Sequence, residues 1–520
     1  MTFWQGLSRR RDEPLRSRHS LPAIFRSLWQ SFRRDLRLPA SDATTSPRIV
    51  IVALFLGLAF AAFNQIGVPL RASHSARVTA DEPFYLLTAV SLIEDGDLDL
   101  QNDYDLRRYR TFFDHPDELW YQSVRTVDGR LLSPHNVGTS LLILPAYALG
   151  GLDGVKRFLG ALGGLTITFA VLLAYRITGR LVASSLAGIL LGLSAPLVIY
   201  ATQIYPEAPG ALLVTAAVWL LLGRTLGTRA AVLLAALLVG LAWLGTKYLV
   251  IGALLALLAL TRLGRSGRLV LVTLLGLNAS AYLGFHLATY GGLTPYSVNQ
   301  IYAGSSTLEL VGRHLELWNR LYRLAGLWVD GEFGVIRWAP ALIIGLVGFP
   351  LLLHRPGPAR WAVPLVFGAQ LLVAVFLSIT MRGWWFPGRM LVVVLPLLAV
   401  PLAHALALAQ RRVWLAAVVT VLGLSNLGIT LALRTAAAAE LVVLAVDPFA
   451  LPAPLFRWTA GLFPVYTVYT ASTWLLTALW LFVAAVLWLA GNCLDRQPAR
   501  IIPAGVPSPA GSEAALEPSK

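Results

Sequence analysis

The stretch IVIVALFLGLAFAAFNQIGVPL, residues 49–70, is a continuous apolar run that contains no charged side chain. A helix needs about 20 apolar residues to cross the hydrocarbon core of a bilayer, so this run predicts a spanning helix. A cleaved signal peptide would place its apolar region within roughly the first 15–30 residues. Because the run begins only at Ile49, we expect a retained helix with the N-terminus in the cytoplasm.

The composition of the whole chain agrees with a membrane location. Of the 520 residues, 57% are hydrophobic and 13% are charged, against roughly 45–50% and 25% in soluble proteins. The mean hydropathy is +0.67. We therefore predict an all-α polytopic membrane protein. A single cysteine, Cys493, excludes an intramolecular disulfide and a cysteine-based zinc site.

Eleven to thirteen spans are consistent with the apolar pattern, and twelve fit it best, two of them short. They lie near 49–70, 155–175, 182–200, 208–223, 230–246, 248–261, 269–289, 338–353, 361–381, 390–409, 413–433 and 468–490. The run 137–151 contains Pro145 and is short for a span. We interpret it as a re-entrant or interfacial helix, because counting it as a span would reverse the side of every later loop.

The distribution of basic residues orients these spans. The net charge of +15 comes from arginines scattered between apolar runs, so the positive-inside rule explains it without nucleic acid. Alternation from a cytoplasmic start places five basic, acid-free connections inside: Arg176/Arg180, Arg224/Arg229, Arg262/Arg265/Arg268, Arg355/Arg360 and Arg411/Arg412. The long connections 71–136, 290–337 and 434–467 then lie outside. We expect a multi-pass protein of a bacterial-type inner (plasma) membrane with an extracytoplasmic active site and both termini in the cytoplasm.

The chain divides into one large unit and two tails. Residues 1–48 form a cytoplasmic tail with a surface-lying piece near Phe25–Phe32, 49–493 form a single transmembrane domain, and 494–520 form a disordered tail. The tail composition of 494–520, rich in Pro, Ala and Ser, is typical of disorder.

The first outer loop, 71–136, concentrates acidic residues. It holds 12 of the 27 acids of the chain. Asp81 is a plausible helix N-cap and Pro83 suits a first turn, so a helix is expected from there to Asp95-Gly96, amphipathic and lying on the membrane. Asp81 has a second interpretation. With Glu82 it forms a carboxylate pair that could take a proton from an attacking hydroxyl and orient a substrate or metal.

The stretch DEPFYLLTAVSLIEDGDLDLQNDY (81–104) resembles the first extracytoplasmic loop of GT-C class glycosyltransferases that use lipid-carrier donors. These include protein O-mannosyltransferases, lipid A aminoarabinose transferases and RgtA/B/C/D-like enzymes. Further similar pieces are SPHNVGTSLLILPAY (133–147), IYPEAPGALL (204–213) and GWWFPGRMLVVVLPLL (383–398). The resemblance implies a polyprenyl-phosphate–sugar donor, with Asp81 as the catalytic carboxylate and Glu82 as its partner.

Two outward-facing residues near span ends are further candidates. Glu207, in YPEAP, is either a favourable acid at a helix start or a group that positions the acceptor or a divalent cation. Lys247, in WLGTKY, either reaches lipid headgroups or contacts the donor phosphate.

Arg382 and Arg389 flank GWWFPG, whose Gly and Pro predict a turn. Both lie on the side that the topology rule disfavours for cations, and guanidinium binds phosphate oxygens bidentately. We therefore assign both to lipid-phosphate binding. His135 is either a loop histidine or a group that lines the cavity and positions the acceptor or a metal.

These features predict a glycosyltransferase that moves a sugar from the lipid donor to an acceptor outside the cytoplasm, with inversion. The acceptor, which could be a protein, a lipid or an envelope glycan, is open, as is a divalent cation (Mg²⁺ or Mn²⁺) at Asp81 and Glu207. Two other classes stay open: a lipid or polysaccharide transporter or flippase, and an O-antigen ligase or polymerase-type enzyme.

Overall fold

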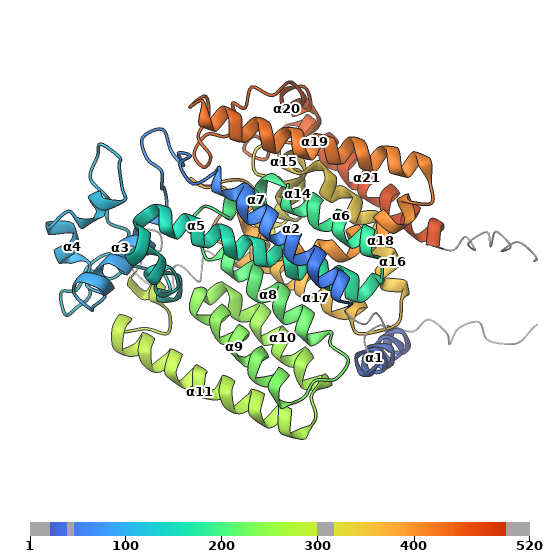
Figure 1. The fold of residues 1–520 in the computed structure, drawn as a ribbon, viewed down its shortest axis with the longest axis horizontal. Helices are drawn as coiled ribbons and strands as arrows, with labels where there is room; N and C mark the ends of the chain where they lie inside the picture. Colours follow the sequence, from blue (N-terminus) through green and yellow to red (C-terminus); the bar gives the residue numbers. More distant parts are fainter. Residues whose placement is uncertain (1–20, 39–45, 299–316, 496–520) are drawn as a thin grey trace, which may run out of the picture.

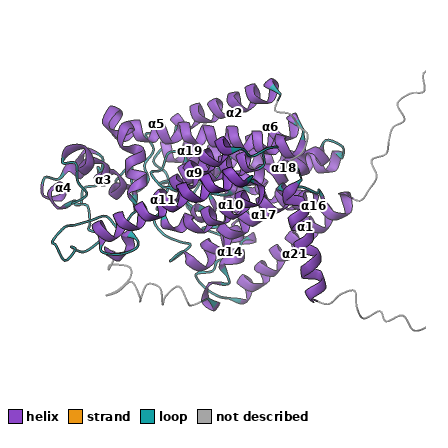
Figure 2. Ribbon diagram, turned by 90° about the horizontal axis from the view of Figure 1, so that it is seen from below, coloured by secondary structure: helices purple, strands orange, loops and turns teal. Residues whose placement is uncertain are grey.

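The computed structural model describes residues 21–38, 46–298 and 317–495. These residues form helices joined by loops, and no strand occurs among them (Figure 2). The longest helices are α2 (Pro47–Gln65), α5 (Val137–Thr178), α11 (Arg265–Tyr290), α19 (Val413–Ala438) and α21 (Ala471–Asp495). The shorter ones of ten or more residues are α1 (Leu21–Arg37), α3 (Glu82–Glu94), α6 (Leu181–Gly192), α8 (Glu207–Leu221), α9 (Thr228–Leu244), α10 (Leu249–Arg262), α16 (Gly345–His354), α17 (Ala359–Leu372) and α18 (Ala399–Ala409). Single turns and short helices include α4 (Gln101–Asp105), α7 (Ala195–Tyr200), α14 (Arg323–Val329), α15 (Val335–Trp338) and α20 (Pro454–Trp458).

The membrane character predicted from the sequence is confirmed. Six helices in the described part are long and apolar enough to cross a membrane. They are Pro47–Gln65, Val137–Thr178, Arg265–Val298, Ala359–Leu377, Val413–Ala438 and Ala471–Leu494. Each of the other predicted spans coincides with one or more shorter helices, so the total of twelve stays a prediction.

Helix α5 is the central element of the bundle. It packs against α2, α3, α6, α8 and α18 (Figure 1). The approach to α2 is close enough to require glycine, because a Cβ on Gly57 would lie 2.6 Å from the carbonyl oxygen of Gly164. Thr168 Oγ1 donates a hydrogen bond across the same contact to the carbonyl of Ala53, at 3.2 Å. Small residues at such a crossing allow two helix backbones to approach.

The run 137–151 forms the first part of α5. Its backbone leaves the helical conformation at Gly150 and Gly151, and Gly151 has φ +56°. A short helix containing Pro145 therefore precedes the longer helix that begins at Leu152. This agrees with a separate short helix, while its position relative to a membrane stays a prediction.

The surroundings of helix α3 differ from those predicted for it. It begins at Glu82 and ends at Glu94, close to the predicted end. However, every residue from Glu82 to Ser91 is buried. The prediction of an amphipathic helix lying on the membrane is therefore wrong for α3. Polar side chains on it are covered by the first outer loop and α5, a tertiary contact that helical periodicity does not reveal.

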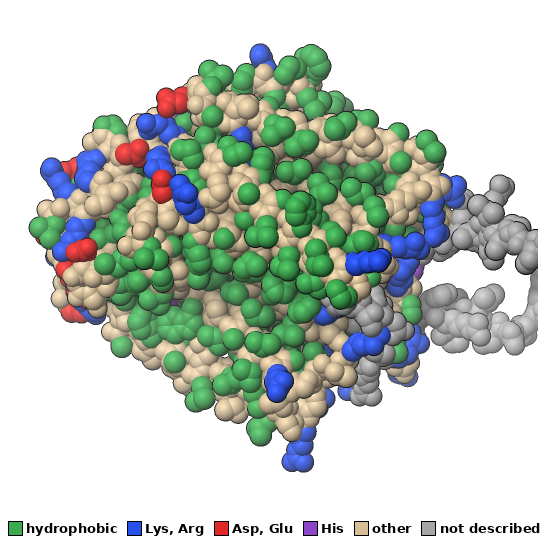
Figure 3. All heavy atoms as spheres, viewed as in Figure 1, with side chains coloured by type: hydrophobic (Ala, Val, Ile, Leu, Met, Phe, Trp, Pro, Cys, Tyr) green, Lys and Arg blue, Asp and Glu red, His purple; other side chains and the backbone are tan. Residues whose placement is uncertain are grey.

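The two ends of the molecule differ in charge. Helices α3 and α4 lie at one end and α1 at the opposite end (Figure 1). On the face drawn in Figure 3, acidic side chains occur together with Lys and Arg near the first end, and Lys and Arg side chains without acidic neighbours gather around the other. Residues 39–45 and 496–520, part of the predicted tails, lie outside the described residues.

Candidate active site

Asp81 stands at the start of α3, but its side chain does not cap the helix. Its Oδ2 atom instead accepts a hydrogen bond from Arg389 Nη2 at 2.8 Å. The side chain is 22% exposed, so the carboxylate is held within the protein and still reachable. Of the two interpretations of Asp81, the structure therefore does not support the capping one.

Arg389 comes from the turn that the GWWFPG stretch predicted. Gly388 has φ +83°, a backbone conformation that residues other than glycine rarely adopt. A Cβ there would also lie 3.1 Å from Val335. The turn opens a single-turn helix, η7 (Arg389–Leu391), and its first residue points at Asp81 and Glu207. The guanidinium also lies over the ring of Tyr205, 4.1 Å from its centroid.

Glu207 and Lys247 complete the charged group. Glu207, at the start of α8, accepts hydrogen bonds at Oε1 from Arg389 Nε at 2.8 Å and from Lys247 Nζ at 2.6 Å. Lys247 lies in η2 (Thr246–Tyr248), the turn between α9 and α10. Asp81, Glu207, Lys247 and Arg389, which we call the charged cluster, carry two negative and two positive charges. An entering phosphate must therefore compete with the two carboxylates for the cations.

His135 lies beside this cluster, just before α5. Its Nε2 atom is 2.6 Å from Gln122 Oε1 and 3.9 Å from Asp81 Oδ1. Because Gln122 Nε2 donates to Asp81 at 3.5 Å, the amide oxygen of Gln122 faces His135 and we assign the imidazole proton to Nε2. His135 thus supports the glutamine that contacts Asp81.

The electrostatic environment fixes the charge of Asp81. Burial raises the pKa of Asp81, but the charges of Arg389, His135 and Lys247 and the hydrogen bond from Arg389 together outweigh it, and the pKa falls to about 2. Burial lowers the pKa of His135, an effect that Asp81 partly offsets. Burial also lowers the pKa of Lys247, and Glu207 partly restores it. At neutral pH Asp81 is therefore a carboxylate beside a neutral His135.

Several polar atoms around the cluster have no hydrogen-bond partner within the described part of the chain. They are the hydroxyls of Tyr205 and Tyr248, Glu207 Oε2 and Trp385 Nε1. Buried polar groups are normally paired. Four unpaired groups beside one cluster of charges are therefore available to a polar ligand.

Glu82 and Arg382 lie outside the charged cluster. The carboxylate of Glu82 is fully buried and accepts hydrogen bonds from the backbone amides of Thr79 at 2.9 Å and Ile204 at 2.8 Å. Arg382 Nη2 donates to the buried Asp330 at 2.8 Å. Of the seven residues predicted from the sequence, the structure thus joins Asp81, His135, Glu207, Lys247 and Arg389, and it engages Glu82 and Arg382 elsewhere.

The cluster is a poor donor set for a divalent cation. Arg389 bridges Asp81 and Glu207, the two carboxylates at which a divalent cation was left open, so their facing oxygens are already paired with a cation. Residues 21–38, 46–298 and 317–495 contain no group of three or more His, Cys, Asp or Glu arranged to bind a metal. We therefore derive no reaction step through a metal.

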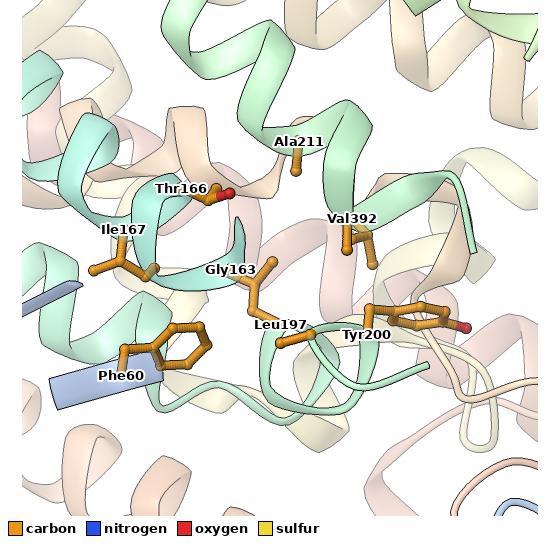
Figure 4. Close-up of a pocket in the computed structure, with 10 residues that line it drawn as sticks. Phe60, Gly163, Thr166, Ile167, Leu197, Tyr200, Ala211 and Val392 are labelled. Carbon is orange, nitrogen blue, oxygen red and sulfur yellow. The ribbon is translucent and has the colours of Figure 1, made fainter. Parts of the chain in front are cut away.

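An apolar pocket lies beside residues that adjoin the cluster, Ala208 next to Glu207 and Val392 near Arg389. Figure 4 shows Phe60, Gly163, Ile167, Leu197 and Val392 around it, with Tyr200 at one side. Tyr200 donates its hydroxyl proton to the carbonyl of Phe386 at 2.5 Å. This bond ties α7 to the turn that carries Arg389. The lining contains no charged group, so the pocket is part of the support and not of the chemistry.

Sequence reasoning missed four residues of the site. Tyr205 and Tyr248 directly adjoin Pro206-Glu207 and Lys247, and an aromatic residue next to a predicted site residue is a usable signal. Trp385 lies in the GWWFPG stretch, where a pair of Trp residues is equally typical of the membrane interface. Gln122 lies in a loop without periodicity, and nothing in its sequence context indicates its contact with Asp81.

Comparison with known proteins gives limited similarity. No family model and no curated protein matches this chain. A solved structure that matches is ArnT from Cupriavidus metallidurans bound to undecaprenyl phosphate. The sequences are 15% identical, the match covers 85% of this chain and 77% of that one, and the TM-score is 0.36.

Proposed function

We propose that this chain is an integral-membrane glycosyltransferase that transfers a sugar from a polyprenyl-phosphate donor to a hydroxyl acceptor outside the cytoplasm. One observation carries the proposal. Asp81, a helix-start carboxylate that caps nothing, is held by Arg389 at 2.8 Å beside Lys247 and Glu207. A carboxylate next to two cations supports this reaction, because the carboxylate can accept a proton and the cations can stabilise a phosphate leaving group.

In the proposed reaction the acceptor oxygen attacks the anomeric carbon as its hydroxyl proton passes to Asp81. The bond between the anomeric carbon and the phosphate oxygen breaks, and its electron pair stays on the phosphate. Arg389 and Lys247 stabilise the charge that develops there. Attack opposite the leaving group inverts the anomeric configuration.

The low pKa of Asp81 sets a condition on this mechanism. A base with a pKa of about 2 is weak, because the best catalytic pKa lies near the working pH. The donor phosphate competes for Arg389 and draws it away from Asp81. The pKa of Asp81 then rises, so the carboxylate becomes a stronger base when the donor is bound.

An apolar cavity offers space for the first part of a polyprenyl tail. It has a volume of about 220 Å³ and is lined by side chains from α14, α15, α16, α17 and α21. Ile336 lines it, and a Cβ on Gly388, the residue before Arg389, would lie 3.1 Å from the side chain of the adjacent Val335. A tail in this cavity would therefore approach the turn that carries Arg389.

The test is a transfer assay on the full chain in nanodiscs with radiolabelled polyprenyl-phosphate hexoses. We expect wild type to release polyprenyl phosphate and Asp81→Asn to be slower by about 10²–10⁴-fold. Asp117→Asn, an exposed carboxylate of the same loop, is the matched control and should keep wild-type activity. Full activity of Asp81→Asn would remove Asp81 from the reaction. Saturable lipid binding without turnover in wild type would instead favour a transporter.

A further inference from the structure

Helix α1, at the opposite end of the molecule from Asp81, has no part in the proposed reaction. It is the segment in which a surface-lying piece was predicted. Its sequence, LPAIFRSLWQSFRRDLR, separates an apolar face from a basic one. At 100° per residue, Leu28, Phe32 and Leu36 fall on one side and Arg26 and Arg34 on the other, with Trp29 and Arg33 next to each other at the boundary between the two faces.

The last turns of α1 are attached to the bundle by a buried acid. Asp35 is fully buried and lies 3.2 Å from Arg360 Nε. It also accepts a hydrogen bond from Trp361 Nε1 at 3.2 Å. Phe32 adds an edge-to-face contact with the Trp361 ring, at 5.4 Å between centroids. Residues 360 and 361 open α17, so α1 has a fixed position at this end of the bundle.

The apolar face continues beyond this attachment without a protein partner. Leu28 is 49% exposed and Trp29 is 47% exposed, whereas Leu36, on the same face, is 2% exposed. Arg26, Arg33 and Arg34 are exposed along the other side. The helix therefore changes from contacting the bundle at its end to being exposed in its middle. There the Trp29 ring stacks on Phe32 and carries the Arg33 guanidinium 5.2 Å from its centroid, so that an apolar and a basic group meet at one edge of the apolar face.

This combination fits a lipid surface. A helix with an apolar face and a basic face lies in the membrane interface, where the apolar side chains enter the acyl boundary and the cations meet anionic headgroups. The end of the bundle that carries α1 is also the end where Lys and Arg gather (Figure 3).

We propose that α1 is an interfacial anchor: Leu28 and Trp29 insert into the bilayer, Arg26, Arg33 and Arg34 bind anionic phospholipid headgroups, and the Asp35–Arg360 pair fixes the helix to the bundle. The anchor is independent of the glycosyl transfer proposed above.

The first experiment measures the depth of α1 in the membrane. Cys493 is the single cysteine, so Cys493→Ser provides a cysteine-free background for the full chain. Spin labels at Leu28→Cys and at the matched Gln30→Cys point to opposite sides of the helix. In nanodiscs containing phosphatidylglycerol, we expect the label at 28 to collide with oxygen more than with a water-soluble nickel complex, and the label at 30 to show the reverse. Equal access of the nickel complex to both labels would overturn the anchor.

The second experiment tests the headgroup charge. Each arginine near an anionic surface strengthens attraction by roughly fivefold. Arg26→Gln, Arg33→Gln and Arg34→Gln together should therefore reduce, severalfold or more, the ratio of phosphatidylglycerol to phosphatidylcholine retained by the purified protein. The matched control replaces Arg107, Arg110 and Arg125, exposed arginines of the first outer loop, and should leave the ratio unchanged. An unchanged ratio in the α1 variant, or concentration-dependent self-association through α1, would refute lipid as its partner.

Discussion

Arg389 and Asp81 are separated by 308 positions in the chain, and yet Nη2 of the first donates to Oδ2 of the second at 2.8 Å. The same guanidinium donates through Nε to Glu207. One side chain therefore joins the starts of α3 and α8 to the turn after α17. The guanidinium is therefore paired with both carboxylates before any ligand enters the site.

The first prediction concerns the geometry of this guanidinium. Arg389→Lys keeps the charge but replaces two directed donors with one flexible ammonium, which cannot hold Asp81 and Glu207 together as arginine does. We expect transfer to fall by about 10²-fold. The rate of transfer from saturating donor in nanodiscs provides the measurement.

Arg110→Lys is the matched control, because Arg110 is an exposed arginine of the first outer loop outside the charged cluster. It should retain full activity. If Arg389→Lys were equally active, charge alone would suffice and the bridging geometry would have no role.

The second prediction is a pH dependence caused by His135. Burial lowers its pKa below the ordinary 6.5, so below that pH the unfolded chain binds a proton that the folded chain excludes. Stability is therefore complete above pH 6.5 and is lost as the pH falls towards the lowered pKa of the folded state. Thermal unfolding of wild type and His135→Gln across this range should show a larger loss in wild type than in the variant.

His115→Gln is the control, since His115 is a histidine of the same loop outside the cluster. Its unfolding temperature should follow that of wild type at each pH. Parallel curves for wild type and His135→Gln would show that burial of His135 does not govern the acid limb.

The sequence was sufficient to predict an all-helical membrane protein and to single out five residues that the structure brings together, for identifiable reasons. The bilayer imposes long apolar runs and a regular placement of arginines on the sequence. A carboxylate or a cation at the end of an apolar run is therefore easy to recognise. The partners were not predictable. Arg382 and Arg389 flank the same turn, and only tertiary contacts decide that Asp330 binds one and Asp81 the other. The burial of α3 was likewise hidden, because the loop that covers it has no periodic pattern.

The third prediction separates Arg382 from donor binding. Asp330 is fully buried, and its Oδ1 accepts hydrogen bonds from the backbone amides of Glu332 and Phe333. Arg382→Gln would leave this buried carboxylate without its cation, and such a loss costs about 3 kcal/mol. We expect a lower unfolding temperature but an unchanged KM for the donor. Lys247→Gln provides the contrast, because it should raise the donor KM; a raised KM in Arg382→Gln would return Arg382 to phosphate binding.

The fourth prediction assigns Glu82 to positioning Asp81. Its two carboxylate oxygens accept from the amides of Thr79 and Ile204, and between Thr79 and Asp81 the chain passes through Ala80 at φ +51°. A non-glycine residue in this region is strained and needs support from its surroundings.

Glu82→Gln keeps the shape of the side chain but presents only one acceptor oxygen. One buried amide therefore loses its hydrogen-bond partner, which lowers the free energy of unfolding by about 1–3 kcal/mol. We expect a lower unfolding temperature together with a reduced kcat, since Asp81 is displaced while donor binding at Lys247 and Arg389 persists. Adding Ala80→Gly relieves the strain, because glycine adopts a positive φ at no steric cost, and should restore part of both quantities. If Glu82→Gln lost all activity at an unchanged unfolding temperature, and Ala80→Gly restored none of it, Glu82 would instead act directly in the reaction, as the sequence resemblance implies.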